Sequence, residues 1–275
     1  MTILVFGKTG QVATELQRWA PVVALGRDQA DLTHPQDCAQ IIRDHAPTAV
    51  INAAAYTAVD QAEDDEPLAT VINGAAPTAM AQACAALNIP FVHISTDYVF
   101  AGDGTAPWAP WDQIAPSNAY GRSKLQGEQG ICTAGGAYAI LRTSWVFSAH
   151  GVNFVKTMLR VSDSHDTLSV VADQIGGPTS ARAIAQACLK VADQLTCDTA
   201  GIYHFSGAPD VSWHGFAQAI FAQAGRDITV HPISTSDYPT PATRPLNSRM
   251  NCDSTLNIFD IARPDWQADL ADVLT

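Results

Sequence analysis

Basic residues are scarce in this chain, which has 15 lysines and arginines against 27 aspartates and glutamates in 275 residues. The resulting net charge is −12. Proteins that bind nucleic acid generally present a basic face, so we expect no nucleic-acid partner. An anionic ligand would have to be met by a few local arginines, lysines or helix N-termini rather than by the overall field.

The sequence also lacks the cysteine spacing of zinc sites and disulfide frameworks. Its six cysteines are scattered with no CxxC pair, a pattern typical of reduced cytosolic thiols. The eight histidines show no metal-ligand spacing, so no metal site is predicted from them. No apolar run reaches membrane-spanning length, and MTILVFGKTG has no basic stretch before a long apolar one. We therefore expect a cytoplasmic protein that does not engage a membrane.

Short, continuous apolar runs are present, and they are typical of parallel strands buried on both faces. Such runs occupy residues 2–6, 22–25, 49–55, 90–95, 138–142 and, after a less regular stretch, 201–206. Helical patterns cover 153–161, 181–195 and 211–225. Together they predict an α/β fold: a Rossmann-type doubly wound parallel sheet with a smaller, interleaved C-terminal substrate domain.

The same patterns suggest a division of the chain. We assign residues 1–147 to a dinucleotide-binding Rossmann domain, to which 171–206 return. Residues 148–170 and 207–275 then form the smaller substrate-binding part.

A glycine-rich turn follows the first predicted strand. The segment GKTGQVA has Gly7, Gly10 and then Ala13, and a helical pattern begins there. A strand, a glycine turn and a helix N-terminus together offer free backbone N–H groups to a pyrophosphate. A plain turn explains the glycines equally well, but the position at the first strand–helix junction favours a dinucleotide site.

The end of the second strand carries an arginine where many dinucleotide folds have an acid. An acid there binds the 2′-hydroxyl of NAD, and a nearby arginine accommodates the 2′-phosphate of NADP. Arg27 follows this strand and the acid is missing, which favours NADPH, with NADH as the alternative. Asp31 and Leu32 come shortly afterwards and are expected near the adenine.

Tyr120 and Lys124 in YGRSK are four residues apart, so they share one face of a helix. A lysine ammonium there would lower the tyrosine pKa, which normally lies near 10, and let the phenol exchange a proton near neutral pH. Pro116 to Asn118 supply a stop and a cap for this helix. Taken alone, the spacing is more typical of a solvated pair on an amphipathic helix.

The segment STDYVF follows the fourth strand and places Thr96 and Asp97 at its carboxyl end. Ligands of open α/β sheets bind beyond that edge. The chain therefore predicts its chemistry between this strand end and the YGRSK helix.

Eight motifs occur in a characteristic order: GKTGQVA, NAAAYTAVDQAE, STDYVF, YGRSKLQGE, RTSWVF, GVNFVKTMLR, DQIGGPT and RPLNS. In this order, from Ile3 to about Arg249, they resemble the dTDP-4-dehydrorhamnose reductase family. That family is a branch of the extended short-chain dehydrogenase/reductase superfamily. YxxxK and the glycine loop belong to the whole superfamily, whereas STDYVF, RTSWVF and DQxGxPT are particular to this branch.

The resemblance implies reduction of a dTDP-4-keto-6-deoxyhexose by NADPH, in the supply of L-rhamnose for cell-surface polysaccharide. It implies that Tyr120 donates a proton to the keto oxygen, which Thr96 also hydrogen-bonds. Lys124 would hydrogen-bond the nicotinamide ribose and depress the Tyr120 pKa.

The resemblance also implies the binding residues. The cofactor side is Gly7, Gly10, Gln11, Val12, Ala54, Ala55, Tyr56, Tyr120 and Lys124, to which the argument from the second strand adds Arg27, Asp31 and Leu32. The substrate side is Thr96, Asp97, Trp145 and Asn153, with Arg244 and Asn247 in family-like motifs. Some relatives hold magnesium at a dimer contact, but the sequence does not place acids for it, and both monomer and homodimer remain open.

Simpler explanations exist for several of these residues. Asp97 could cap the turn after its strand, Trp145 could be core packing, and Asn153 could be a helix N-cap. Arg244, before a proline, could be a surface residue.

Two other functions also fit the superfamily. The first is a nucleotide-sugar epimerase or dehydratase, although dehydratases have an Asp-Glu pair where this chain has Asp97-Tyr98. The second is a regulatory subunit that binds cofactor without turnover, against which the intact Tyr120, Lys124 and Thr96 argue.

Overall fold

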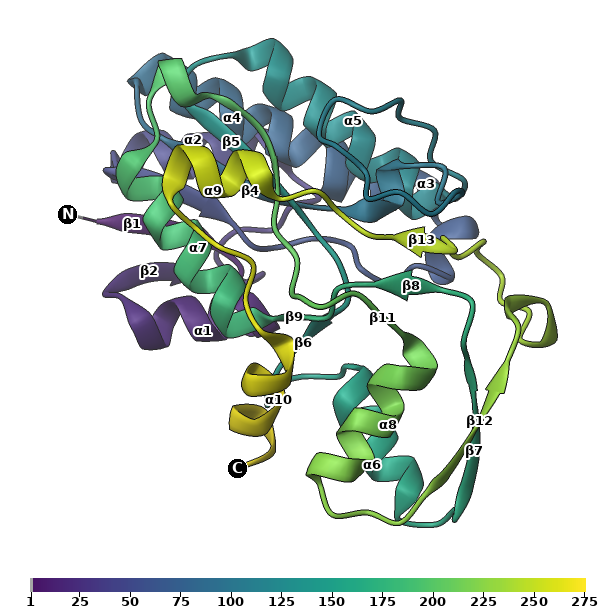
Figure 1. Ribbon diagram of the computed structural model, residues 1–275. Coiled ribbons are helices and arrows are strands. Elements are labelled where there is room, and N and C mark those ends of the chain that lie inside the picture. The colour runs from purple at the N-terminus through teal and green to yellow at the C-terminus, as the bar shows by residue number, and fades with distance from the viewer. Residues whose placement is uncertain (1) are drawn as a thin grey trace.

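The computed structural model describes residues 2–275, and its centre is a parallel sheet of six strands (Figure 1). The strand order is β10-β5-β4-β3-β1-β2, and every neighbouring pair is parallel. The strands are β1 (Ile3–Phe6), β2 (Val22–Leu25), β3 (Ala49–Asn52), β4 (Phe91–Thr96), β5 (Tyr138–Thr143) and β10 (Gly201–His204). The chain runs outward from β1 to β2 and then returns to β3, which creates a topological switch point between β1 and β3.

Helices cover both faces of this sheet, as the continuous apolar strands require. One face packs against α1 (Gln11–Trp19), α7 (Ala181–Gln194) and α9 (Asp253–Phe259). The other face packs against α2 (Pro35–His45), α4 (Ala76–Leu87) and α5 (Ala119–Ala134). The predicted Rossmann-type doubly wound fold is confirmed.

The helical run before β4 contains a wide turn. It begins as α3 (Glu66–Thr70), passes through one π-helical turn, η2 (Val71–Ala75), and continues as α4. Single π turns inside α-helices are frequent at functional sites. Here Asn73 on η2 is buried and donates from Nδ2 to Ser123 Oγ of α5 at 2.9 Å, which ties the wide turn to the helix that carries Tyr120.

A second group of elements forms the lower lobe in Figure 1. The parallel pair β7 (Thr167–Val171) and β12 (Thr229–Ile233) packs with α6 (Phe154–Ser162) and α8 (Trp213–Gln223). Helix α10 (Trp266–Leu274) closes this cluster through Trp266 and Leu270.

Short elements connect the two parts. The brief strands are β6 (Val146–Phe147), β8 (Ile175–Gly176), β9 (Thr179–Ser180), β11 (Val211–Ser212) and β13 (Asn247–Ser248). They pair as β6–β9 and β11–β8–β13. The 3₁₀ turns are η1 (Gln61–Glu63), η3 (Asp97–Val99), η4 (Cys197–Thr199) and η5 (Thr235–Asp237).

The elements within 171–206 and 207–275 pack partly on the central sheet and partly outside it. Within 171–206, both α7 and β10 lie on the central sheet, whereas β8 and β9 pair outside it. Within 207–275, α9 packs on the Rossmann layer, because Phe259 belongs to the cluster under α1 and α7. We propose the domain limits with this one exchange, in which α9 joins the Rossmann part.

Among residues 2–275, no helix combines the length and the apolar character needed to cross a membrane.

Candidate active site

A cleft of about 850 Å³ opens at the carboxyl edge of the sheet. This is the edge where open α/β sheets bind their ligands, and the volume is that of a small-molecule site. The cleft wall brings together most of the predicted residues: Gly7, Gly10, Gln11, Val12, Arg27, Asp31, Leu32, Ala54, Ala55, Thr96, Asp97, Tyr120, Lys124 and Trp145.

The glycine loop forms one end of this cleft. Gly7 has φ +108°, in the left-handed region, and an added Cβ would lie 3.3 Å from the carbonyl carbon of Ala53, which directly follows β3. Gly10 precedes α1 with no side-chain cap, and the space beside its Cα is open. The first N–H groups of α1 are therefore free of side-chain partners at the cleft, as pyrophosphate binding requires.

The cleft wall also carries a positively charged side chain, Arg27. The Arg27 side chain is 79% exposed, and its Nε lies 3.4 Å from Asp31 Oδ2. Hydrogen bonds from Thr33 hold the pKa of Asp31 below its ordinary value, with a smaller contribution from Arg27. Because Arg27 is held only loosely, its guanidinium is available to an anionic group in the cleft.

Helix α5, which contributes Tyr120 and Lys124 to the cleft wall, begins with the predicted cap. Asn118 Oδ1 accepts the backbone N–H of Gly121 at 2.7 Å, so the N-cap is confirmed. A Cβ at Gly121 would collide with the carbonyl oxygen of Tyr98, so only glycine lets α5 approach η3 this closely. This approach places Tyr120 against Tyr98, with ring centroids 5.6 Å apart, beside the end of β4.

The electrostatics of Tyr120 correct one expectation. Burial raises the pKa of Tyr120 well above its ordinary value; a hydrogen bond with Thr96 lowers it, and the charge of Asp97 raises it further. Lys124 does not contribute, because its amino group is directed elsewhere: Nζ donates to the Ile94 carbonyl at 2.7 Å and lies 3.1 Å from His93 Nε2. The predicted depression of the Tyr120 pKa by Lys124 is therefore wrong for this structure.

Asp97 and Thr96 divide the roles that the sequence left open. Thr96, not Asp97, caps the turn η3, since Thr96 Oγ1 accepts the N–H of Tyr98 at 3.2 Å. Asp97 is buried and accepts hydrogen bonds from Thr96 Oγ1 and from Ser248 Oγ. Burial raises the pKa of Asp97 to about 6.

Two tryptophans form an apolar part of the wall. Trp145 stacks on Trp213 of α8, with ring centroids 3.7 Å apart and planes at 12°, and both line the cleft. The sequence analysis did not identify Trp213, because an aromatic residue at the start of an amphipathic helix is usually a core residue. Thr143, also on the wall, has a buried hydroxyl with no partner among residues 2–275.

Four expected residues lie outside the cleft wall. Tyr56 packs beside Tyr120 in a small cluster with Ala62, Ala69 and Ala119. Arg244 Nη2 pairs with Asp60 at 2.6 Å. Asn247 Nδ2 donates to the carbonyls of Asp103 and Ala106, which fixes the loop after β4.

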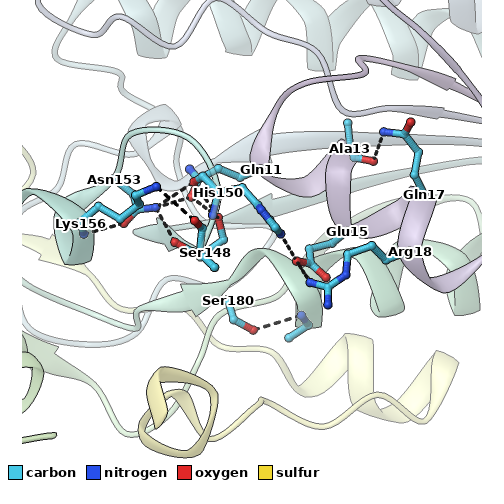
Figure 2. Close-up of polar contacts among 12 residues, drawn as sticks. Gln11, Ala13, Glu15, Gln17, Arg18, Ser148, His150, Asn153, Lys156 and Ser180 are labelled. Carbon is cyan, nitrogen blue, oxygen red and sulfur yellow. Dashed lines mark hydrogen bonds and ion pairs between the residues drawn. The ribbon is translucent and has the colours of Figure 1, made fainter. Parts of the chain in front are cut away.

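The fourth, Asn153, is a structural cap rather than part of the wall. Its Oδ1 accepts the N–H of Lys156, and its Nδ2 donates to Gln11 Oε1 at 2.9 Å and to the carbonyls of Ser148 and His150 (Figure 2). Ser148 Oγ donates to the same Gln11 oxygen at 2.8 Å. Gln11 thus joins the glycine loop to the start of α6.

The residues present fit a dinucleotide but not a metal. The uncapped start of α1 and the unpartnered Thr143 hydroxyl both face a cleft of suitable size. Within residues 2–275, no cluster of three or more His, Cys, Asp or Glu side chains could hold a metal ion. Magnesium is therefore not supported.

A parallel sheet whose cleft is lined by both a glycine loop and a Tyr–Lys helix defines a dinucleotide-binding oxidoreductase of the short-chain dehydrogenase/reductase class. Within this class, the chain belongs to the dTDP-4-dehydrorhamnose reductase family. The family model described as the RmlD substrate binding domain matches residues 1–275.

Individual relatives of the chain carry the same family name. A dTDP-4-dehydrorhamnose reductase of Sinorhizobium fredii is 44% identical over 97% of this chain and 94% of its own length. The Salmonella typhimurium reductase is 40% identical over 100% and 97%. A Bacillus anthracis reductase, solved in complex with NADP, is 34% identical with a TM-score of 0.93 over 99% of this chain and 98% of its own.

Proposed function

We propose that this protein reduces dTDP-4-dehydro-β-L-rhamnose to dTDP-L-rhamnose with NADPH. The observation that carries the proposal is that Tyr120, Thr96 and Lys124 line the same cleft as the glycine loop. The names of the relatives supply the substrate, and the Bacillus anthracis complex supports the cofactor.

The chain's own residues have distinct tasks in this reaction. The free N–H groups at the start of α1 would hold the pyrophosphate, and Ala54 and Ala55 would lie alongside the cofactor. Bound NADPH supplies the hydride that reaches the keto carbon. The negative charge that develops on the keto oxygen must be met by donors placed in advance.

Tyr120 and Thr96 are the donors available for this oxygen. Both hydroxyls line the cleft beside the end of β4, so one oxygen atom can approach both, and Thr96 would turn its hydrogen from Asp97 Oδ1 to that oxygen. Tyr120 gives its proton to the oxygen, while Thr96 holds the oxygen in position. Because burial keeps the phenol protonated at neutral pH, Tyr120 is ready as an acid before the substrate binds.

Loss of NADPH absorbance on addition of dTDP-4-dehydrorhamnose tests the function directly. We expect turnover that depends on both compounds, with dTDP-L-rhamnose as the product. Tight NADPH binding without turnover of this sugar would contradict the proposal and favour a cofactor-binding regulatory subunit. Turnover without net NADPH consumption would instead indicate an epimerase.

The preference for NADPH should depend on Arg27. We expect Arg27→Ala to weaken NADPH binding by about tenfold, because one exposed charge-assisted contact with the 2′-phosphate is lost. NADH binding should change less than twofold. Titration of each cofactor against both proteins by calorimetry measures this, and equal losses for the two cofactors would remove the reason for choosing NADPH.

A further inference from the structure

A buried row of polar side chains crosses the sheet behind the cleft. Asn52 on β3 and His93 on β4 are register partners, and Lys124 of α5 lies next in line. Each is 1% exposed. Asn52 Nδ2 lies 3.1 Å from His93 Nδ1, and His93 Nε2 lies 3.1 Å from Lys124 Nζ.

The backbone fixes the direction of hydrogen bonding in this row. The N–H of Ala54 donates to Asn52 Oδ1 at 3.1 Å, so the amide nitrogen of Asn52 must face His93. The reverse orientation would set that NH₂ group against the Ala54 N–H. His93 Nδ1 therefore accepts, and the neutral ring carries its proton on Nε2. Burial keeps the ring neutral, because it holds the His93 pKa well below its ordinary value.

The Nε2 proton of His93 points at Lys124. An ammonium group has three N–H bonds and no lone pair, so it cannot accept this proton. A neutral amine can accept from His93 and still donate to the Ile94 carbonyl, which it does at 2.7 Å. The geometry points to Asn52 and His93 as positioning residues that stabilise Lys124 in its neutral amine form.

The other charged groups near Lys124 do not reverse this conclusion. Glu128, one turn further along α5, favours the ammonium form, but both of its oxygens are already bonded to Arg142 of β5. Tyr120, one turn earlier, is a neutral phenol, and Asp97 lies beyond it and acts on Tyr120. Burial lowers the Lys124 pKa to about 8, which agrees with the direction set by His93.

The neutral form of Lys124 is inferred from hydrogen bonds alone, and only its consequence for catalysis rests on the proposed function. A lysine whose pKa is lowered to about 8 changes its charge just above neutral pH. A fixed cation at the site would not do so. The charge of Lys124 would then depend on pH, and the Asn52–His93 pair would determine where that change falls.

NMR of the whole protein, labelled with ¹³C at lysine Cε and ¹⁵N in the histidine rings, tests the inference without any activity measurement. The chain has four lysines, and Lys124→Met assigns the Lys124 signal. We expect the His93 proton on Nε2 and a Lys124 pKa well below those of Lys8, Lys156 and Lys190. A proton on Nδ1, or a Lys124 pKa equal to the other three, would overturn the inference.

Two variants at Asn52 give a second readout. Asn52→Leu frees His93 to move its proton to Nδ1 and offer Nε2 as an acceptor, so the Lys124 pKa should rise by about one unit or more. Asn52→Asp should also favour the proton on His93 Nδ1, because a carboxylate can only accept a hydrogen bond, and it adds a negative charge. The basic limb of the kcat profile should follow the Lys124 pKa in each variant. An unchanged Lys124 pKa in both folded variants would refute a positioning role, whereas absent turnover with the expected NMR result would contradict only the proposed function.

Discussion

Replacing Tyr120 with phenylalanine is expected to lower kcat by about 10²–10⁴-fold, the usual contribution of a positioned general acid. The variant keeps the ring that packs against Tyr98 and removes only the hydroxyl. Its affinity for NADPH should stay within about twofold, because the substitution leaves the glycine loop and the free start of α1 unchanged. Stopped-flow reduction and cofactor titration measure the two quantities separately.

Thr96→Val provides a matched control for this experiment. It removes the second donor to the keto oxygen and should lower kcat by a smaller factor, since the proton source remains. A Tyr120→Phe protein with wild-type kcat would show that the proton comes from another group. Equal losses of kcat and of NADPH affinity would show that the substitution disturbs the whole cleft.

The largest expected effect on stability comes from Arg142→Met. Arg142 and Glu128 form a buried ion pair in which both side chains are almost fully enclosed, with Nη2 to Oε2 at 2.6 Å and Nε to Oε1 at 2.9 Å. Removing the guanidinium leaves a buried carboxylate with Ser95 as its remaining hydrogen-bond donor. We expect the free energy of unfolding to fall by about 3–5 kcal/mol, as for other buried pairs that lose one partner.

Denaturant unfolding of the single and double variants checks this value. In Glu128→Leu/Arg142→Met the unpaired charge is gone, so most of the lost stability should return. A single variant within about 1 kcal/mol of the wild type would show that water reaches the carboxylate. Arg142 also donates to the Pro110 carbonyl at 3.2 Å, so the loop after β4 should become more sensitive to proteolysis.

The sequence predicted those parts of the fold whose signal is local. Buried parallel strands appear as unbroken apolar runs, so Val22–Leu25 was located to the residue and the other central strands to within a few. The predicted run 49–55 was too long: β3 ends at Asn52, and the small residues after it leave the sheet to line the cleft. The wide turn Val71–Ala75 could not be read, because its backbone geometry leaves no distinct pattern of apolar residues.

The site residues that belong to a motif of fixed spacing could be predicted. Those whose role depends on a contact between distant parts of the chain could not. Tyr120, Lys124 and the glycine loop have fixed spacings, and all of them line the cleft. The direction in which Lys124 points depends on His93, thirty-one positions away, which sequence spacing does not relate to it. Asn153 shows the opposite case, since a polar residue before an apolar helix fits a cap and a ligand equally well, and the structure has the cap.

The Trp145–Trp213 stack has a mechanical consequence. Trp145 has φ +50°, a left-handed backbone conformation that is rare for a bulky residue. The ring that stacks on it belongs to α8 in the lower lobe, while its own backbone directly follows β5 of the sheet. The stack therefore joins the lower lobe to the cleft wall beside the sheet, so any movement of α8 relative to the sheet would have to displace these two rings.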